Sequence, residues 1–570
     1  MVLLAGMLLA LALWILLGQG LAFVGAFRLP WALGLYLPAL YLLARWYTGD
    51  PSSPLGFPPP RPSLPRPLAW LLALAGWGAV GLALVPLLTW PVLTHRYQPW
   101  VLWDVVYYHL PKAVDLVQKG HMWNLALPYG QYPIGWETWL ALLVGLHRNA
   151  LGLGILSAWV VFMWALTMWA LMRQYGRLPS ALSAFVVGML VVAVHVGWRW
   201  TPWHLVGFLL LAVGKNDLVA AVLVLAGLLH AAPERLHWRG FLLYLAAAWA
   251  VKPMAGAFLL AVWGFWLGRM TGDKRRAWLI GGGLAWLLGS LWLLRNLVVM
   301  GRPFSPIASI LQKRALLWHV FLPEFWQLPR YQLLFITGVV LGMGVWAWYR
   351  PSWRYRAGLL AGLYGLFLIT PAVVPPGKEK LIQWRFALAL LSWMWVLLAS
   401  WAIEVWPWER LWFRRGAWFG LLVVLGLLGG AIYARVPRMW QWEPRAARII
   451  EDPFLEPPAS GPYRSVFDYI DRNLQHARIE AGVPFYYLYD PALTNEGVRP
   501  GHFPAGMPWV VPQPQPTHRL FCSLQWTWRG EAHVKDSQAV QEQKQRWQLQ
   551  GYRILYSDPA CVLAQISVSP

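Results

Sequence analysis

Apolar segments recur along the first 435 residues and are separated by short polar turns. Many of them reach the roughly 20 residues that an α-helix needs to cross a bilayer. This pattern predicts an all-α polytopic membrane protein with about 13–15 transmembrane segments. Short segments are tolerated where they line a cavity inside the protein, so we expect the middle third of the chain to build a site. The segments are 2–22, 31–47, 68–90, 136–147, 151–172, 179–197, 203–214, 218–232, 239–251, 254–268, 276–299, 331–349, 356–374, 381–402 and 416–434.

The pattern changes near residue 436, where charged residues, proline and glutamine become more frequent. Residues 466–471 alternate apolar and acidic side chains at helical spacing, which predicts an amphipathic helix. Short runs rich in β-branched and aromatic residues predict strands. Together they predict a small extracytoplasmic α/β domain over residues 436–570. The expected strands are 484–489, 520–525, 552–556 and 561–568.

Two further units precede that domain. Residues 1–67 hold two transmembrane helices and a proline-rich cytoplasmic linker, which cannot be helical throughout. Residues 68–435 form the membrane core, and within it residues 91–135 form a long extracytoplasmic loop. The first segment lacks a basic start and a small-residue cleavage site, so we expect a retained helix.

Composition agrees with a membrane location. The chain is 58% hydrophobic and 12% charged, whereas a soluble globular chain carries roughly 25% charged residues. Its 43 tryptophans lie mostly near the ends of the apolar runs, as in an interfacial aromatic belt. The two cysteines, Cys522 and Cys561, would be able to form a disulfide if the C-terminal end lies outside the cytoplasm.

The net charge of +23 indicates membrane orientation, and we expect no nucleic-acid partner. With the N-terminus in the cytoplasm, the most basic short loops all fall inside, as the positive-inside rule requires. The basic turn at residues 173–177 falls outside and is the one misfit. A basic surface also suits anionic membrane lipids or a lipid phosphate. The inside loops are 45–66, 234–239, 269–276, 350–356 and 409–415.

The stretch from Trp103 to His121 is the most polar part of the membrane core. At helical spacing one face carries Asp104, Tyr108, Lys112, Asp115 and Lys119. Because a proline ring blocks a regular helical turn, the helix is expected to start near Pro111. Residues 104–109 would then form a turn presented to a cavity. The competing interpretation is a helix on the lipid surface with snorkelling lysines and no chemistry.

Other charged residues stand at the mouths of apolar segments. Asp217 is either functional, paired with Lys215, or next to a helix capped by Asn216. Lys252 either snorkels or binds an anion. Arg295 and Arg385 lie at the ends of spans, where a lone arginine is usually an interface anchor.

These residue types suit transfer of a sugar from a lipid phosphate. A base must take the proton of the acceptor, and cations must hold the departing phosphate. No Cys/His metal pattern exists, so no metal ligands are assigned, although two carboxylates could hold a hard divalent ion.

The run Trp103, Asp104, Tyr107, Tyr108, His109, Leu110, Pro111, Lys112 resembles the first extracytoplasmic loop of type-C fold glycosyltransferases. The nearest group is the family 39-like enzymes, which include protein mannosyltransferases and aminoarabinose transferases. Shorter motifs similar to those of the same family follow in order along the chain. They are Gly130-Gln131-Tyr132-Pro133, Gly214-Lys215-Asn216-Asp217, Val251-Lys252-Pro253, Arg295-Asn296, residues 301–306 and Trp384-Arg385.

The resemblance implies a polyprenyl-phosphate sugar donor and a lipid, glycan or protein acceptor. It assigns catalysis to Asp104, with Asp217 as a second acid. Lys215, Lys252, Arg295 and Arg385 would hold phosphate. Tyr107, Tyr108, His109 and Lys112 would complete the substrate pocket. Two features depart from the family: Val105 stands where many members have a second acid, and two extra spans precede the motif.

We therefore expect a glycosyltransferase at the outer face of the cytoplasmic membrane, acting in cell-envelope glycosylation. A transporter or lipid flippase is the alternative, although its typical repeated halves are not found in the sequence. A non-catalytic assembly scaffold is a third interpretation.

Overall fold

The computed structural model describes most of the helical core and most of the C-terminal domain. Asp104, Arg385 and the expected boundary at residue 436 lie outside the described residues. The described ranges are 2–48, 64–89, 100–101, 105–146, 150–195, 212–232, 236–303, 330–369, 388–405, 464–482, 488–490, 492–498, 514–526 and 532–566.

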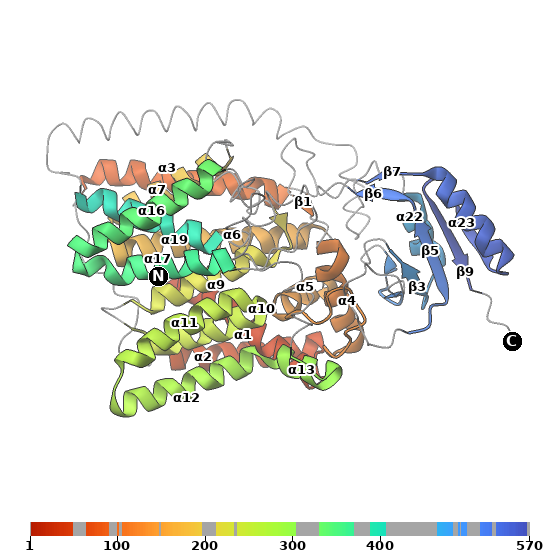
Figure 1. Cartoon of the computed structure of the whole chain (residues 1–570), viewed down its shortest axis with the longest axis horizontal. Coiled ribbons are helices and arrows are strands. Elements are labelled where there is room, and N and C mark those ends of the chain that lie inside the picture. The colour runs from red at the N-terminus through yellow and green to blue at the C-terminus, as the bar shows by residue number, and fades with distance from the viewer. Residues whose placement is uncertain are drawn as a thin grey trace.

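Long apolar helices form a bundle that makes up most of the molecule (Figure 1). Their interiors pack Leu, Val, Ala and Trp into one continuous apolar core. The helices are α1 (Val2–Phe23), α2 (Leu29–Thr48), α3 (Arg66–Thr89), α4 (Leu110–Lys119), α5 (Gly135–Leu146), α6 (Ala150–Gly176), α7 (Ser180–His195), α9 (Asn216–His230), α10 (Trp238–Val251), α11 (Pro253–Arg269), α12 (Gly272–Gly289), α13 (Leu291–Met300), α16 (Arg330–Tyr349), α17 (Arg354–Ile369) and α19 (Leu388–Val405).

Within the described residues, four helices are long and apolar enough to cross a membrane, or up to five if α12 and α13 form one bent span. The four are the main parts of α1, α3, α6 and α19. Several other apolar helices are shorter than a full crossing, as the middle third of the sequence predicted. A helical membrane protein is therefore supported, whereas the count of 13–15 segments stays a prediction.

Loop contacts define two opposite ends of the bundle. At the motif end, the N–H of Phe27 donates to the carbonyl of Gly120, and that of Met122 donates to Ala22. At the basic end, the hydroxyl of Tyr47 contacts Nε2 of His230 at 2.6 Å, and Tyr355 donates to the carbonyl of Ala231. Tyr47, His237 and Tyr355, each from a different basic loop, therefore lie together at the end opposite the motif.

Helix α5 does not run from one end of the bundle to the other. At its start, Gly135 packs against the carbonyl of Ala250, two residues before Lys252. At its finish, Gly145 packs against Leu29, the first residue of α2. Both ends of this 12-residue helix thus lie toward the motif end.

This short helix removes the misfit in the charge pattern. Helix α6 starts at the motif end, where Oγ of Ser157 accepts from the N–H of Gly214. It finishes at the basic end, where the hydroxyl of Tyr175 donates to the carbonyl of Leu228. The expectation that residues 173–177 lie on the motif side is wrong, because α5 had been counted as a full crossing.

The C-terminal domain is a five-stranded sheet with two helices, and it lies beside α4 and α5 at the motif end (Figure 1). The strand order is β4-β3-β5-β9-β8, with β3 parallel to both neighbours and the other pairs antiparallel. Its elements are α22 (Arg464–Asn473), β3 (Arg478–Ala481), β4 (Glu496–Val498), β5 (His518–Cys522), β6 (Leu524–Trp526), β7 (Ala532–Val534), α23 (Ser537–Leu549), β8 (Arg553–Ser557) and β9 (Cys561–Gln565).

Most of the expected elements of this domain are present. The helix predicted at residues 466–471 is α22, and the last three expected strands correspond to β5 with β6, β8 and β9. Most of the strand expected at 484–489 lies outside the described residues. The pattern missed β3, β4, β7 and the polar helix α23, whose first turn is capped by the carboxylate of Asp536.

A disulfide joins Cys522 on β5 to Cys561 on β9. The two residues are directly opposite each other in the antiparallel register. Disulfides persist in oxidising compartments, so this pair suits an extracytoplasmic domain.

We predict that both cysteines resist alkylation when the chain is denatured without reductant. Intact-mass measurement after reduction should show two added alkyl groups, since the chain has two cysteines. In the control Cys522→Ser, Cys561 should react without reduction. Alkylation of both thiols in the unreduced wild type would contradict the disulfide.

Candidate active site

A π-helical turn, η1 (Val105–His109), leads directly into α4. Pro111 explains this geometry, because it has no N–H to donate and its ring clashes with the carbonyl four residues earlier. A widened turn relieves the clash, and such turns are frequent at functional sites. The regular α-helix begins at Leu110, one residue before the expected start, but the chain is already helical from Val105.

The expected surface helix is wrong, and the turn before it is buried from Val105 onward. Tyr107 and His109 are buried within η1, and Lys112 and Asp115 are buried within α4. The reason is that α4 packs against α5 on one side and meets the C-terminal domain near its end. Its polar side chains therefore lie inside the protein and not on a lipid surface.

Glu137 of α5 joins two of the motif residues in a buried cluster. Nδ1 of His109 lies 2.9 Å from Oε1 of Glu137, and Nζ of Lys112 lies 3.6 Å from the same oxygen. The exposed fractions are 1% for His109, 4% for Lys112 and 2% for Glu137. His109 and Lys112 thus share one carboxylate oxygen of Glu137 in the protein interior.

Tyrosine rings surround the ammonium of Lys112. Its Nζ lies 5.3 Å from the ring centroid of Tyr108 and 5.7 Å from that of Tyr132, within cation–π range. The ring of Tyr129 packs between them, and its φ of 53° is in the left-handed region. Such strained positions in non-glycine residues concentrate at functional sites.

A short parallel pairing brings the second expected motif beside the first. Strand β1 (Trp100–Val101) pairs with β2 (Ala212–Val213), so the chain entering the motif runs next to the chain entering α9. Trp136, the neighbour of Glu137, donates through Nε1 to the carbonyl of Gly214 at 2.8 Å. Lys215 is consequently placed close to His109 and is itself buried.

Asp217 forms a salt bridge with Lys252, which precedes α11. Helix α9 begins at Asn216, with Lys215 in the capping position, so the expected cap by Asn216 is wrong. The Asp217–Lys252 pair stands at the edge of a pocket between α9, α11, α17 and α19. The remaining lining side chains are apolar, including Val224, Phe258 and Phe367.

Arg295 holds the loop between α4 and α5 in place. Its guanidinium donates to the carbonyls of Met122 and Tyr132 and to Oδ1 of Asn296. The side chain is 1% exposed, so it is not an interface anchor. Since most of its donors are used by the protein, it is better described as a positioning residue than as a phosphate ligand.

Burial shifts the pKa values of two motif residues, Lys112 and His109. Burial lowers the pKa of Lys112 to about 8, although Glu137 acts in the opposite direction. Burial also lowers the pKa of His109 by more than the hydrogen bond to Glu137 raises it, and the nearby charges of Lys215 and Lys112 add to the decrease. Neutral His109 is therefore favoured.

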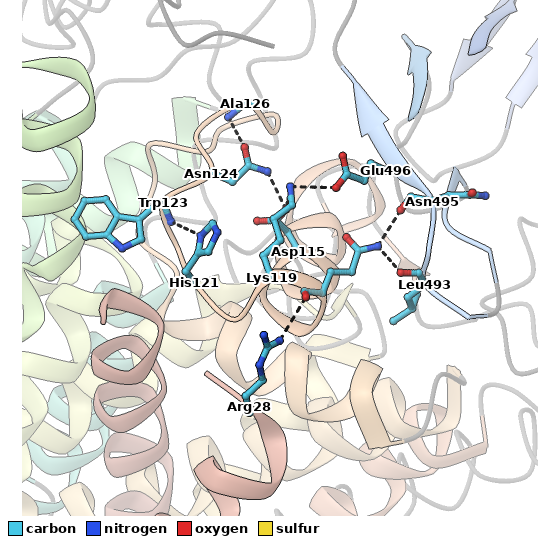
Figure 2. Close-up of polar contacts among 11 residues, drawn as sticks. Arg28, Asp115, Lys119, His121, Trp123, Asn124, Ala126, Leu493, Asn495 and Glu496 are labelled. Atoms are coloured by element: carbon cyan, nitrogen blue, oxygen red, sulfur yellow. Dashed lines mark hydrogen bonds and ion pairs between the residues drawn. The ribbon is translucent and has the colours of Figure 1, made fainter. Parts of the chain in front are cut away.

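The far end of α4 is joined to the C-terminal domain (Figure 2). The side-chain amide of Gln118 donates to the carbonyls of Leu493 and Asn495, the latter at 2.9 Å. Nζ of Lys119 lies 2.9 Å from Oδ1 of Asp115 and 3.5 Å from Oε1 of Glu496. Helix α4 thus connects the buried cluster at its start to the soluble domain at its end.

The structure brings together most of the residues expected from the sequence. His109 and Lys112 contact Glu137, Tyr108 packs on His109, and Lys215 lies near His109. Asp217, two residues after Lys215, pairs with Lys252. Glu137 was overlooked by sequence reasoning, although a lone acid in an apolar segment is a recognisable signal. Within the described ranges, no group of three His, Cys, Asp or Glu side chains could hold a metal ion.

We predict that Arg295→Met lowers the free energy of unfolding by about 2–4 kcal/mol, because two buried carbonyls lose a charged donor. Thermal unfolding in detergent should shift down by several degrees. Arg302→Met is the matched control, since Arg302 is exposed at the same end. Equal melting temperatures of the two variants would contradict the positioning role.

No protein-family model and no curated protein matches this chain. Functional conclusions therefore rest on the geometry of the site and on the resemblance of the motifs.

Proposed function

We propose that the chain is a membrane glycosyltransferase that transfers a sugar from a polyprenyl-phosphate donor to a lipid, glycan or protein acceptor. The observation that carries this proposal is a group of buried and half-buried cations beside an apolar pocket that Asp217 and Lys252 line. Such an arrangement suits a ligand with an anionic head and a long apolar tail.

The first support for the proposal is the net positive charge of the residue cluster. Within the described residues, the cluster holds four cations and two carboxylates, which gives +4 − 2 = +2 with His109 neutral. One further carboxylate would leave the cluster cationic. Lysine and arginine side chains are the usual protein partners of phosphate groups, so this group of cations suits an anionic ligand such as phosphate. The residues are Lys112, Lys215, Lys252 and Arg295 against Glu137 and Asp217.

The second support for the proposal is the apolar lining of the pocket. On α9 its lining follows one helical stripe from Asp217 through Ala220 and Ala221 to Val224. Seven residues of helix correspond to roughly 10 Å, so the apolar lining continues about that far below the charged pair. An isoprenoid tail in this pocket would place its phosphate near Lys252.

Orientation follows from the positive-inside rule. With α5 no longer counted as a crossing, residues 173–177 lie with the other basic loops, and this end would face the cytoplasm. The motif end and the disulfide-bonded domain would then face outward. The proposed location is the cytoplasmic membrane, with the N-terminus inside and catalysis at the outer face.

The roles of the residues combine structure and resemblance. Lys112, Lys215 and Lys252 would hold the phosphate, whose negative charge grows as the sugar leaves. Tyr108 would contact the sugar, as aromatic faces do. By resemblance to type-C fold enzymes, Asp104 would position or deprotonate the acceptor, and this role rests on the sequence alone.

We predict that deleting the chain removes a specific glycan from the cell envelope, measured by mass analysis, and leaves its lipid-linked donor on the outer face. Wild-type chain and Lys274→Met should restore the glycan, because Lys274 is exposed at the basic end. Asp104→Asn and Lys252→Met should not restore it at equal abundance. Accumulation of the lipid-linked sugar on the inner face would instead identify a flippase.

We also predict that affinity for polyprenyl phosphate decreases as pH rises from about 7.5 to about 9.5. Lys112 is charged below its pKa of about 8 and neutral above it. The second ionisation of a phosphate monoester, roughly at pH 6, is complete throughout this range. Titration in lipid nanodiscs should show a several-fold loss. Lys112→Met should bind more weakly at the lower pH and depend less on pH, and an unchanged profile would exclude Lys112 from the phosphate site.

A further inference from the structure

The His109–Glu137 pair has the geometry of an acid–base dyad. Oε1 of Glu137 lies 2.9 Å from Nδ1 of His109. An ionised carboxylate only accepts hydrogen bonds, so Nδ1 carries the proton and the lone pair is on Nε2. We propose that Nε2 of His109 removes the proton of an acceptor hydroxyl and that Glu137 is its positioning residue. This proposal rests on the proposed glycosyltransferase function and names the base for it.

Burial points to a ligand at this nitrogen. His109 is 1% exposed, and its Nε2 has no hydrogen-bond partner among the described residues. Nζ of Lys112 also lacks a hydrogen-bond partner there, beyond its ion pair with Glu137. Buried polar atoms are normally hydrogen-bonded. A substrate with a hydroxyl group to donate to Nε2 and an anionic oxygen to accept from Nζ would give both atoms a hydrogen-bond partner.

The surrounding charges favour a neutral hydroxyl acceptor over a protonated amine. The charged groups that act on His109 are Glu137 from α5, Lys112 from α4 and Lys215 before α9. The two lysines would repel an ammonium group, and together with burial they keep His109 neutral and able to accept a proton. Glu137 stabilises the imidazolium once it forms.

The transfer step is balanced without a further reactant. The acceptor oxygen attacks the anomeric carbon of the donor sugar while its proton moves to Nε2 of His109. The bond between the anomeric carbon and the phosphate oxygen breaks, and the electron pair leaves with the polyprenyl phosphate. Lys112 lies beside Glu137 and so holds the leaving phosphate on the same side as the dyad. Release of the proton from His109 restores the resting site.

The acceptor class follows from the neighbouring rings. Tyr108 packs on His109 with centroids 4.2 Å apart, and Tyr129 packs on Tyr108 at 4.9 Å. Aromatic faces suit the apolar face of a sugar ring, so a saccharide hydroxyl fits better than a small alcohol.

The test compares His109→Gln and Glu137→Gln with the control His121→Gln. His121 lies on the same segment outside the cluster, where its Nδ1 accepts from the N–H of Trp123 (Figure 2). Two quantities are measured in nanodiscs. The first is the affinity for polyprenyl phosphate. The second is the pH profile of sugar transfer from the lipid-linked donor that accumulates on deletion.

We expect His109→Gln to reduce transfer at least 100-fold, as general-base loss typically does, with less than about threefold change in affinity. Glu137→Gln should reduce transfer and move the acidic limb of the pH profile to lower pH, because the carboxylate raises the pKa of His109. A purely structural role of Glu137 would leave that limb in place. His121→Gln should match the wild type.

The outcomes separate this proposal from the proposed function. Wild-type transfer in His109→Gln would overturn the dyad alone and leave Asp104 as the base. An unmoved acidic limb in Glu137→Gln would overturn it even if His109→Gln folds poorly. A wild-type protein that neither binds polyprenyl phosphate nor transfers sugar would overturn both.

Discussion

The carboxylate of Glu137 is the interaction on which the candidate site depends. One of its oxygens contacts His109 and Lys112, which come from the turn and helix that follow the motif. Without this acid, two lysines and an arginine would stand buried beside a histidine with no counter-charge on α5, and such burial is strongly unfavourable. Glu137 therefore offsets part of the positive charge that is buried around it.

The position of Glu137 depends in turn on a helix that does not cross the bundle. Helix α5 returns to the motif end, and its second residue, Trp136, is hydrogen-bonded to the loop before α9. Arg295 fixes the connection between α4 and α5 from the other side by donating to two of its carbonyls. Elements from distant parts of the chain thus hold the motif in place through its backbone.

Helix α4 relates this buried site to the soluble domain. Its first turn bears Lys112, and its last turn bears Gln118 and Lys119, which contact the loop and strand around Glu496 (Figure 2). The six to seven residues between them correspond to roughly 10 Å of helix. The C-terminal domain therefore contacts the helix that carries the motif lysine Lys112.

The sequence by itself determined the helical membrane architecture, the C-terminal α/β domain and the motif residues. These features are encoded locally, in the length of apolar runs, in strand patterning and in Pro111. It also placed Lys215, Asp217 and Lys252 among the candidates, because a charge beside an apolar segment stands out. Asp104 and Arg385 remain sequence predictions.

Only the tertiary structure decided that the motif helix is buried, that α5 turns back, and that Glu137 is the partner of His109 and Lys112. Periodicity shows which face of a helix is polar but not which element packs on that face. The pattern of α4 by itself is therefore typical of a surface helix. The position of Arg295 at the end of an apolar segment likewise predicts an interface anchor, whereas in the structure its guanidinium donates to two backbone carbonyls. These outcomes depend on contacts between residues far apart in the chain, and no local pattern encodes which distant segment will supply the opposing charge.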